Sequence, residues 1–345
     1  MNRLLAAAVS LSCAVFAQSG ALPYSKSTKL VISTCGPVRI IGEMRPDAAY
    51  TISERRGQVQ VIAKPGEADT QKFWLKAMEP GATATLEMKV PRGLAILIET
   101  TGGDVEAIEI DGTVTAKTGW GRVTVDRLSN GAVIQTGGGD VRVGRVIGEV
   151  KCYSRAGSIT ADSVQGGHLQ TDGGEILVRE STAPLVVKTG GGNVRLLHAK
   201  VGVEATTAGG VVDVQWSGGP VVARTGGGSI QVGGAKGVQC DTGMGAVRLK
   251  NVSGKLNAVT AAGTILAELP SNSPLEDSRL KTAVGDVILI IPSNLSVTVK
   301  AAGRKVISDF PGIRGETAAY GELQGGGPLV LVEAPGGTVF LRKKH

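Results

Sequence analysis

A short motif of the form Thr-x-x-Gly-x-Val recurs along most of this chain at a nearly constant interval. Copies start at Thr100, Thr118, Thr136, Ser154, Thr171, Thr189, Thr207, Thr225, Thr242, Thr260 and Thr282, at successive intervals of 18, 18, 18, 17, 18, 18, 18, 17, 18 and 22 residues. Outlying copies align at Ser33, Lys300 and Ala334, which gives fourteen in all. A fixed period of this size is the signature of stacked repeat architectures.

Within each copy, apolar and polar residues alternate with a period of two, which indicates a β-strand. Two aligned columns are apolar throughout and are therefore expected to be buried. The first stands two residues after the glycine: Val105, Val123, Val141, Ile159, Ile176, Val194, Val212, Ile230, Val247, Ile265 and Val287. The second stands two residues before the next start: Ala116, Ile134, Cys152, Leu169, Val187, Ala205, Ala223, Cys240, Ala258 and Leu280.

One such turn is too small to bury its own apolar residues, so consecutive turns must stack edge to edge, at roughly 4.8 Å per turn. The sequence thus predicts an all-β fold, a single-stranded parallel β-solenoid (β-helix) with about 18 residues per turn and irregular β caps at both ends. We favour a right-handed coil over a left-handed one. The composition agrees, because 51 glycines with only 3% aromatic residues suit many tight turns around a narrow core.

The glycine column is predicted to be a structural corner, because glycine tolerates the positive φ of a sharp turn. Its members are Gly103, Gly121, Gly139, Gly157, Gly174, Gly192, Gly210, Gly228, Gly245, Gly263 and Gly285. The threonines that start the copies are expected to form a stacked ladder at the same corner. Eleven equivalent copies favour a structural role over phosphate binding, since phosphate-binding glycine loops open a helix.

The predicted organisation has four parts. Residues 1–17 resemble a secretory signal peptide, with Arg3 before an apolar run and a small-residue cleavage site at Ala17. Residues 18–99 are expected to form a first turn and an N-terminal cap, 100–300 the solenoid, and 301–345 a C-terminal turn and cap. The protein is therefore expected to be exported, to the periplasm, the outer surface or the medium. Lipidation of Cys13 stays open.

The cysteines outside the leader are Cys35, Cys152 and Cys240, an odd number that argues against a disulfide framework in an exported protein. Cys152 and Cys240 fall in one inward column five repeats apart, about 24 Å at the spacing between strands. That separation exceeds disulfide reach. Both are predicted to be small core residues.

Several segments resemble a known family. They are Met88 to Gly93 leading into Glu99 to Val105, the repeated Thr-Gly-Gly-Gly strands, and Ser293 to Leu295 running on to Ile307 to Pro311. Together they are similar to the bacterial putative-adhesin family of β-strand repeat proteins, a domain of unknown function. The resemblance implies an exported β-solenoid without established catalytic residues, so no site residue carries over.

Chemistry-bearing residues are scarce. Glycoside hydrolysis usually needs two carboxylates facing one groove. Asp104 and Asp140 share an outward column but have Arg122 between them, and Asp126 and Asp162 form a similar pair. We interpret both pairs as parts of a solvated, charge-alternating face. The histidines, His168, His198 and His345, lack zinc-type spacing, so neither a metal nor a cofactor is expected.

The remaining candidates for a ligand surface are the aromatic residues Trp120, Tyr153 and Trp216. The predicted function is a non-catalytic extracytoplasmic β-solenoid, an adhesin or cell-envelope scaffold that presents a rigid surface to a glycan or an envelope protein. Two alternatives stay open: a β-helix polysaccharide lyase or hydrolase, and a self-assembling filament. The net charge of +7 is spread along the chain, and export argues against nucleic acid as a partner. The oligomeric state stays open.

Overall fold

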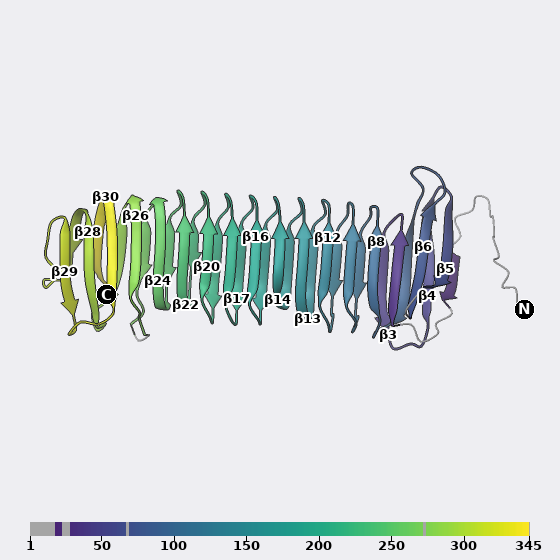
Figure 1. Ribbon diagram of the computed structural model, residues 1–345, viewed down its shortest axis with the longest axis horizontal. Helices are drawn as coiled ribbons and strands as arrows, with labels where there is room; N and C mark the ends of the chain where they lie inside the picture. Colours follow the sequence, from purple (N-terminus) through teal and green to yellow (C-terminus); the bar gives the residue numbers. More distant parts are fainter. Residues whose placement is uncertain (1–17, 23–27, 67–68, 272–273, 345) are drawn as a thin grey trace, which may run out of the picture.

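The chain forms a long stack of β-strands with its two ends far apart (Figure 1). The computed structural model describes residues 18–22, 28–66, 69–271 and 274–344, and these fold into strands and turns without a helix. No helix that is long and apolar enough to cross a bilayer occurs among them. The predicted signal peptide, residues 1–17 with Cys13, lies outside the described residues.

Each regular turn contributes one strand to each of two opposing faces, which we call face A and face B. Face A contains β8 (Ala95–Thr100), β10 (Val114–Thr118), β12 (Ala132–Thr136), β16 (Leu185–Thr189), β18 (Val203–Thr207), β20 (Val221–Thr225), β22 (Ala235–Thr242), β24 (Val252–Ala262) and β26 (Ser278–Val284). Face B contains β9 (Val105–Ile108), β11 (Val123–Asp126), β15 (Ile176–Ser181), β17 (Val194–Ala199), β19 (Val212–Ser217), β21 (Ile230–Val232), β23 (Val247–Lys250), β25 (Ile265–Glu268) and β27 (Val287–Pro292). The long strands β13 (Val141–Ser154) and β14 (Ile159–Thr171) start on face B and end on face A.

Neighbouring turns pair in parallel and in register, so equivalent residues of successive copies lie side by side. On face A Thr118 is the partner of Thr136, and on face B Val123 is the partner of Val141, each eighteen positions farther along the chain. The prediction of an all-β, mainly parallel stack is confirmed. The handedness of the coil stays a prediction.

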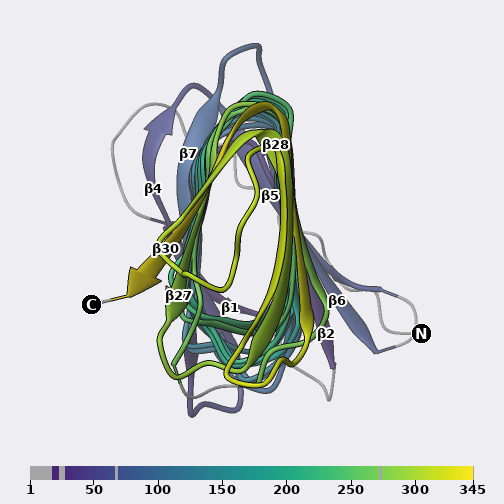
Figure 2. The ribbon, with the colours of Figure 1, turned by 90° about the vertical axis from the view of Figure 1, so that its left-hand side faces the viewer.

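The core runs along the axis between the two faces, which form the long sides of a flattened ring when the stack is viewed end-on (Figure 2). Both apolar columns predicted from the sequence point into it and are buried. Cys152 and Cys240 are buried free thiols in the face A column, as predicted. The face B column is uniformly Val or Ile, whereas the face A column varies from Ala to Leu, and both continue from turn to turn because the turns pair in register.

A first corner, from the start residue to the glycine three positions on, joins face A to face B. There the start residue is buried, and its hydroxyl bonds across to the preceding turn. Thr207 Oγ1 donates to the carbonyl oxygen of Gly192 at 2.8 Å and accepts the N–H of Gly210 at 3.1 Å. The hydroxyl of every start residue from Thr100 to Thr282 donates in this way to a glycine carbonyl of the neighbouring turn, at 2.8–3.2 Å.

The sequence-based reason for the corner glycines was wrong at most positions. Only Gly103, Gly121 and Gly285 adopt a positive φ. Close approach between turns explains the other eight, because a Cβ at Gly210 would lie 2.0 Å from the carbonyl oxygen of Gly192, and one at Gly139 would lie 1.7 Å from that of Gly121. The glycines therefore stack backbone on backbone, which leaves no room for a side chain.

A second corner, from the end of each face B strand to the next face A strand, absorbs the variation in repeat length. The distance from the start residue to the buried Val or Ile is five positions in every copy from Thr100 to Thr282. The two 17-residue repeats are one residue shorter than the 18-residue repeats, and the missing residue falls after that point. The extra residues of the 22-residue repeat lie between β25 and β26. The first corner is thus constant and the second is variable.

The N-terminal end does not stack in chain order. Its strands are β1 (Gln18–Leu22), β2 (Lys29–Thr34), β3 (Val38–Glu43), β4 (Ala48–Arg56), β5 (Val59–Pro65), β6 (Thr70–Ala77) and β7 (Thr83–Pro91). The turn formed by β2 and β3 lies between the β8–β9 turn and the later strands β6 and β7. Antiparallel strands β5, β4 and β1 then cover the end.

The C-terminal end is also out of order. There β30 (Leu329–Lys344) inserts between the β26–β27 turn and β28 (Val297–Ser308), and β29 (Ala318–Leu323) closes the stack as an antiparallel strand. The expectation that consecutive turns always stack on each other is therefore wrong at both ends. In each cap, strands that are distant in sequence pair with each other. A search for a fixed period does not detect such pairing.

Two outlying copies are shifted from their predicted alignment. Thr34, not Ser33, pairs with Thr100, because the first corner there is one residue shorter. Gly303, not Lys300, pairs with Ala334. Ala334 itself stands in the start column, since its neighbour Glu333 pairs with Lys281.

Candidate binding surface

The outer side of face A carries an open groove of about 720 Å³ near the N-terminal end. It crosses five turns, from β2 through β8, β10 and β12 to the face A part of β13. Its lining consists of Ser33, Thr34, Glu99, Thr100, Thr101, Lys117, Thr118, Gly119, Gln135, Thr136, Gly137, Tyr153 and Arg155. The repeat therefore produces one continuous outer surface from residues that are more than a hundred positions apart.

Two rows of equivalent residues form the groove. The first row is outward-facing and in register, with Lys117 paired to Glu99 and to Gln135, and Gln135 paired to Tyr153. The second row directly follows the buried threonines in the sequence. Over three turns it consists of residues with small side chains or none, namely Thr101, Gly119 and Gly137. The groove is hollow because long side chains of one row stand beside the nearly bare backbone of the other.

Charges along the groove occur in opposite pairs. Lys117 Nζ lies 3.3 Å from Glu99 Oε1. At the other end the Tyr153 hydroxyl donates to Asp172 Oδ2 at 2.7 Å, and that hydrogen bond raises the pKa of the phenol. Tyr153 therefore stays protonated at neutral pH and its ring is fixed in place. Arg155 and Asp172 directly follow the paired residues Ser154 and Thr171, so a second positive and negative group flank this end.

Trp74 belongs to the same outward row and was missed in the sequence. It lies on β6 as the partner of Ser33, with the buried Phe73 and Leu75 on either side, so its ring faces outward. The ammonium group of Lys64 lies 5.1 Å from the centroid of the ring. No sequence signal marked this position, because β6 comes to lie beside β2, at the end of the groove, only through the out-of-order stacking of the N-terminal cap.

Trp120 stands at the rim of the groove. It directly follows the lining residue Gly119, and its ring lies against Gly138, where a Cβ would be 2.5 Å from the indole. The side chain is 68% exposed. Two of the three predicted aromatic residues, Trp120 and Tyr153, are therefore near this groove.

Trp216 is not brought to this groove. It lies on the outer side of face B, where its indole stacks on the His198 ring with centroids 4.2 Å apart and an interplanar angle of 11°. Neighbouring Glu180 pairs with His198 in register, and Lys200 holds the pKa of that carboxyl below its usual value. The three predicted aromatics thus do not form one platform.

The carboxylates considered for catalysis hold backbone or arginine groups instead of converging on one point. Asp104 Oδ1 accepts the N–H of Arg122 at 2.8 Å, and Asp140 Oδ1 accepts the N–H of Ser158 at 2.9 Å, each in the following turn. These two side chains replace backbone acceptors beside the first corner. The interpretation as a merely solvated face was therefore incomplete.

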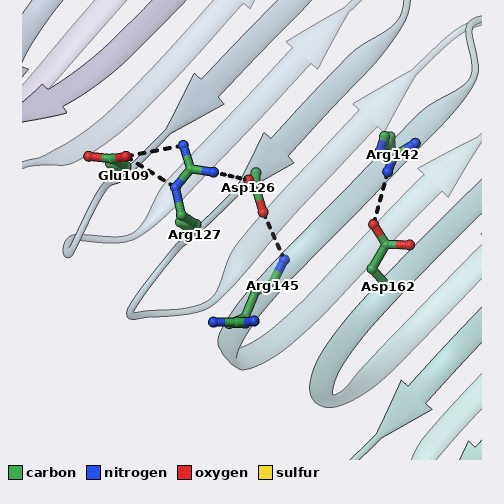
Figure 3. Close-up of polar contacts among 6 residues, drawn as sticks. All are labelled: Glu109, Asp126, Arg127, Arg142, Arg145 and Asp162. Carbon is green, nitrogen blue, oxygen red and sulfur yellow. Dashed lines mark hydrogen bonds and ion pairs between the residues drawn. The ribbon is translucent and has the colours of Figure 1, made fainter.

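Asp126 and Asp162 are held by arginines on the outer side of face B (Figure 3). Asp126 accepts from Arg127 at 2.6 Å and from the backbone N–H of Arg145 at 3.0 Å. Asp162 lies between Arg142 and Arg179, at 3.1 and 2.8 Å. In the drawn contacts each carboxylate faces arginine nitrogen, and the two carboxylates do not point toward each other.

Residues with metal-binding side chains are dispersed. His168 lies on face A beside a second hollow of about 530 Å³, within hydrogen-bond distance of Gln170 at 3.2 Å, whereas His198 lies on face B. His345 lies outside the described residues. Across the part of the chain that the structure describes, no group of three His, Cys, Asp or Glu side chains is close enough together to hold a metal ion.

No family model matches the chain. No curated protein matches it in sequence either. Among solved structures, it aligns with a putative adhesin from Bacteroides fragilis NCTC 9343 at 13% identity and a TM-score of 0.29, over 96% of this chain and 98% of that one. A putative cell adhesion protein from Clostridium sporogenes ATCC 15579 aligns at 8% identity and a TM-score of 0.21, over 95% and 99%.

A putative lipid binding protein from Parabacteroides distasonis ATCC 8503 aligns at 10% identity and a TM-score of 0.26, over 94% of this chain and 96% of that one. At TM-scores this low, none of the three alignments supports an argument about site or activity. The candidate surface therefore depends on the geometry of the chain itself.

Proposed function

We propose that the protein is a non-catalytic extracytoplasmic β-solenoid, an adhesin or cell-envelope scaffold that binds its partner along the groove of face A. The observation that carries this proposal is the groove itself: in-register rows of exposed polar side chains on a surface that every turn fixes through its backbone. A ligand that binds there meets a preformed surface, which lowers the entropic cost of association.

The proposal includes a right-handed coil of 18-residue turns and export by cleavage of residues 1–17. Absence of turnover is also part of it. Its support is that Asp126 and Asp162 form ion pairs with arginines and that Asp104 and Asp140 accept backbone N–H groups, so neither pair is arranged as acid and nucleophile.

The caps oppose the addition of further strands at the two ends of the stack, which argues against the filament alternative. At one end Gly321 of β29 packs against Ile313, and Tyr320 forms a bridge with Arg314, so that the outer edge is partly covered. At the other end β5 finishes in Lys64 and Pro65, residue types that block strand pairing at a sheet edge.

Co-sedimentation with isolated cell-envelope fractions tests the function. We expect saturable binding that is lost when Gln135→Trp fills the groove and is retained in Gln215→Trp, a matched change at an exposed position of face B. The same incubations should yield no new reducing ends and no unsaturated sugars. Turnover of the envelope material, or equal binding by both variants, would contradict the proposal.

A further inference from the structure

We propose that the ligand of the face A groove is an extended, uncharged oligosaccharide chain that lies parallel to the solenoid axis, between Trp74 and Tyr153. This inference rests on the proposed function and adds the chemical class and the direction of the ligand. It is carried by the aromatic residues at the two ends of one row, by the groups between them, and by the balance of charge.

The shape of the groove selects a linear ligand. Trp74 and Tyr153 occupy the same row, five strand spacings apart, which corresponds to about 24 Å. Between them stand Ser33, Glu99, Lys117 and Gln135, one per turn. A small compact molecule would occupy only part of this length, whereas a linear polymer would contact each turn in succession.

The chemistry between the two rings suits hydroxyl groups. The row offers a hydroxyl from Ser33, an amide from Gln135, and the paired carboxylate and ammonium of Glu99 and Lys117 at 3.3 Å. Each of these groups can donate to or accept from sugar hydroxyls. Because Glu99 and Lys117 already neutralise each other, a charged ligand would gain little from either residue.

Charge balance also favours a neutral ligand. Glu99 and Asp172 offset Lys117 and Arg155 over the groove and its Tyr153 end, and at the other end a further positive group, the ammonium of Lys64, lies over the Trp74 ring. At the ends stand the half-buried ring of Trp74, with Lys64 over it, and the exposed ring of Tyr153, and the exposed Trp120 indole adds a third apolar surface at the rim. Sugar rings combine an apolar C–H face with a polar hydroxyl edge, and this groove combines the matching surfaces.

A peptide fits this groove less well than a carbohydrate. Peptides commonly add as a strand to a free sheet edge, or place side chains into apolar pockets. Here the floor is the face of the sheet, where β2, β8, β10, β12 and β13 are each paired on both sides in parallel register. The groove therefore offers no strand edge, and its row of polar groups provides no apolar pocket.

Isothermal titration calorimetry on the full mature chain tests the proposal with defined probes: cellohexaose, chitohexaose, the corresponding trisaccharides, and a hexamer of galacturonic acid. We expect at least one neutral hexasaccharide to bind with a one-to-one stoichiometry. Its trisaccharide should bind at least about tenfold more weakly, because a trimer cannot reach both rings. The charged hexamer should bind more weakly than the neutral one.

Variants locate the ligand. Tyr153→Ala should weaken hexasaccharide binding about tenfold, the size of a lost aromatic contact, whereas Tyr153→Phe should keep most of the affinity because the ring remains. Trp216→Ala, on face B, is the matched control and should bind as the wild type does. Circular dichroism melting of each variant separates loss of binding from loss of folding.

The outcomes separate this inference from the function on which it rests. If no neutral hexasaccharide binds, or only the galacturonic acid hexamer does, the proposed ligand class is wrong. Binding to envelope fractions that still depends on Gln135 would then leave the function standing, with a peptide or an anionic polymer as ligand. If envelope binding is itself absent, both proposals fail.

Discussion

The two corners of each turn differ in how regularly their contacts recur from turn to turn. At the first corner, Thr hydroxyls and glycine backbones of neighbouring turns touch directly, and the spacing from start residue to buried Val or Ile is constant across eleven copies. At the second corner the chain length varies, by the loss of one residue in two repeats and by an insertion before β26. Backbones also approach closely at the second corner, as where a Cβ at Gly131 would lie 2.5 Å from the Glu149 carbonyl oxygen, but these contacts do not recur at the same position in every turn, and the chain length there varies.

The two corners therefore differ in how much change of sequence they tolerate. The first corner sets the register of every turn, so its start residues and corner glycines have little freedom to change, although its intervening positions such as Thr101 and Gly119 line the groove. That corner holds the outward positions on the faces in place, but the residue type at these positions varies from turn to turn. One such row consists of Glu99, Lys117, Gln135 and Tyr153. Specificity therefore resides on the faces.

Inserting one residue into each corner in turn should give the largest difference in stability between two variants. A Ser inserted between Gly209 and Gly210 shifts β19 by one position and turns Val212 and Val214 toward solvent. We expect the free energy of unfolding to fall by at least about 4 kcal/mol, from the lost burial of these side chains. A Ser inserted after Pro270, at the variable corner, should cost less than about 1 kcal/mol. Equal midpoints of urea unfolding, followed by circular dichroism, would contradict the distinction.

Adjacent glycines at one corner provide a finer test. Ala at Gly210 would place a Cβ 2.0 Å from the Gly192 carbonyl oxygen, so Gly210→Ala should destabilise the protein by about 3 kcal/mol through overpacking. Gly209 has nothing within 4 Å of its Cβ position, and Gly209→Ala should change stability by less than about 0.5 kcal/mol. Similar melting curves for the two variants would show that the glycine stack can relax.

The buried hydroxyl ladder should have an intermediate effect. Thr207→Val removes the donor to Gly192 and the acceptor for Gly210, which should cost about 1–3 kcal/mol because buried backbone groups lose their partners. Thr207→Ser keeps both bonds, as Ser154 does in its own copy, and should cost less than about 1 kcal/mol. A valine variant as stable as the serine variant would rule out a role for the ladder, and urea unfolding measures both.

The two buried thiols should give the smallest effect, and a pH-dependent one. Burial raises the pKa of both Cys152 and Cys240 to about 12. An unfolded thiol ionises near its ordinary pKa, so folding stability is intact below about pH 8.5 and declines as the pH rises toward 12. We expect the melting temperature to fall between pH 8 and pH 10 more in the wild type than in a Cys152→Ala, Cys240→Ala variant. Equal falls would show that other groups set the alkaline limit.

The thiols also show whether loosening a corner reaches the core. In the native protein at pH 8, neither should react with iodoacetamide, because each is buried and protonated. Gly210→Ala should speed the alkylation of Cys240, which lies two turns away, whereas the insertion after Pro270 should not. Peptide mapping by mass spectrometry identifies the labelled residue.

Much of the regular region could be predicted from the sequence because each turn repeats the same contacts. The alternation around Val123 and the apolar column with Cys152 identified the buried side of both faces correctly. The aromatics were harder: Tyr153 follows from its outward column, but Trp74 joins the groove through pairing of β6 with β2, which no period reveals. The role of Gly210 was also hidden, since close approach of two backbones leaves the same glycine signal as a sharp turn.

The out-of-order strands at the two ends affect how the molecule comes apart. A stack in simple chain order could unfold from either end, one turn after another. Here the β2–β3 turn is clasped between β6–β7 and β8–β9, and β30 is clasped between β26–β27 and β28. Releasing β30 or the β2–β3 turn therefore means breaking strand pairing on both of its sides at once, so neither segment can peel away from a free edge, whereas β1 pairs, among the described strands, only with β4.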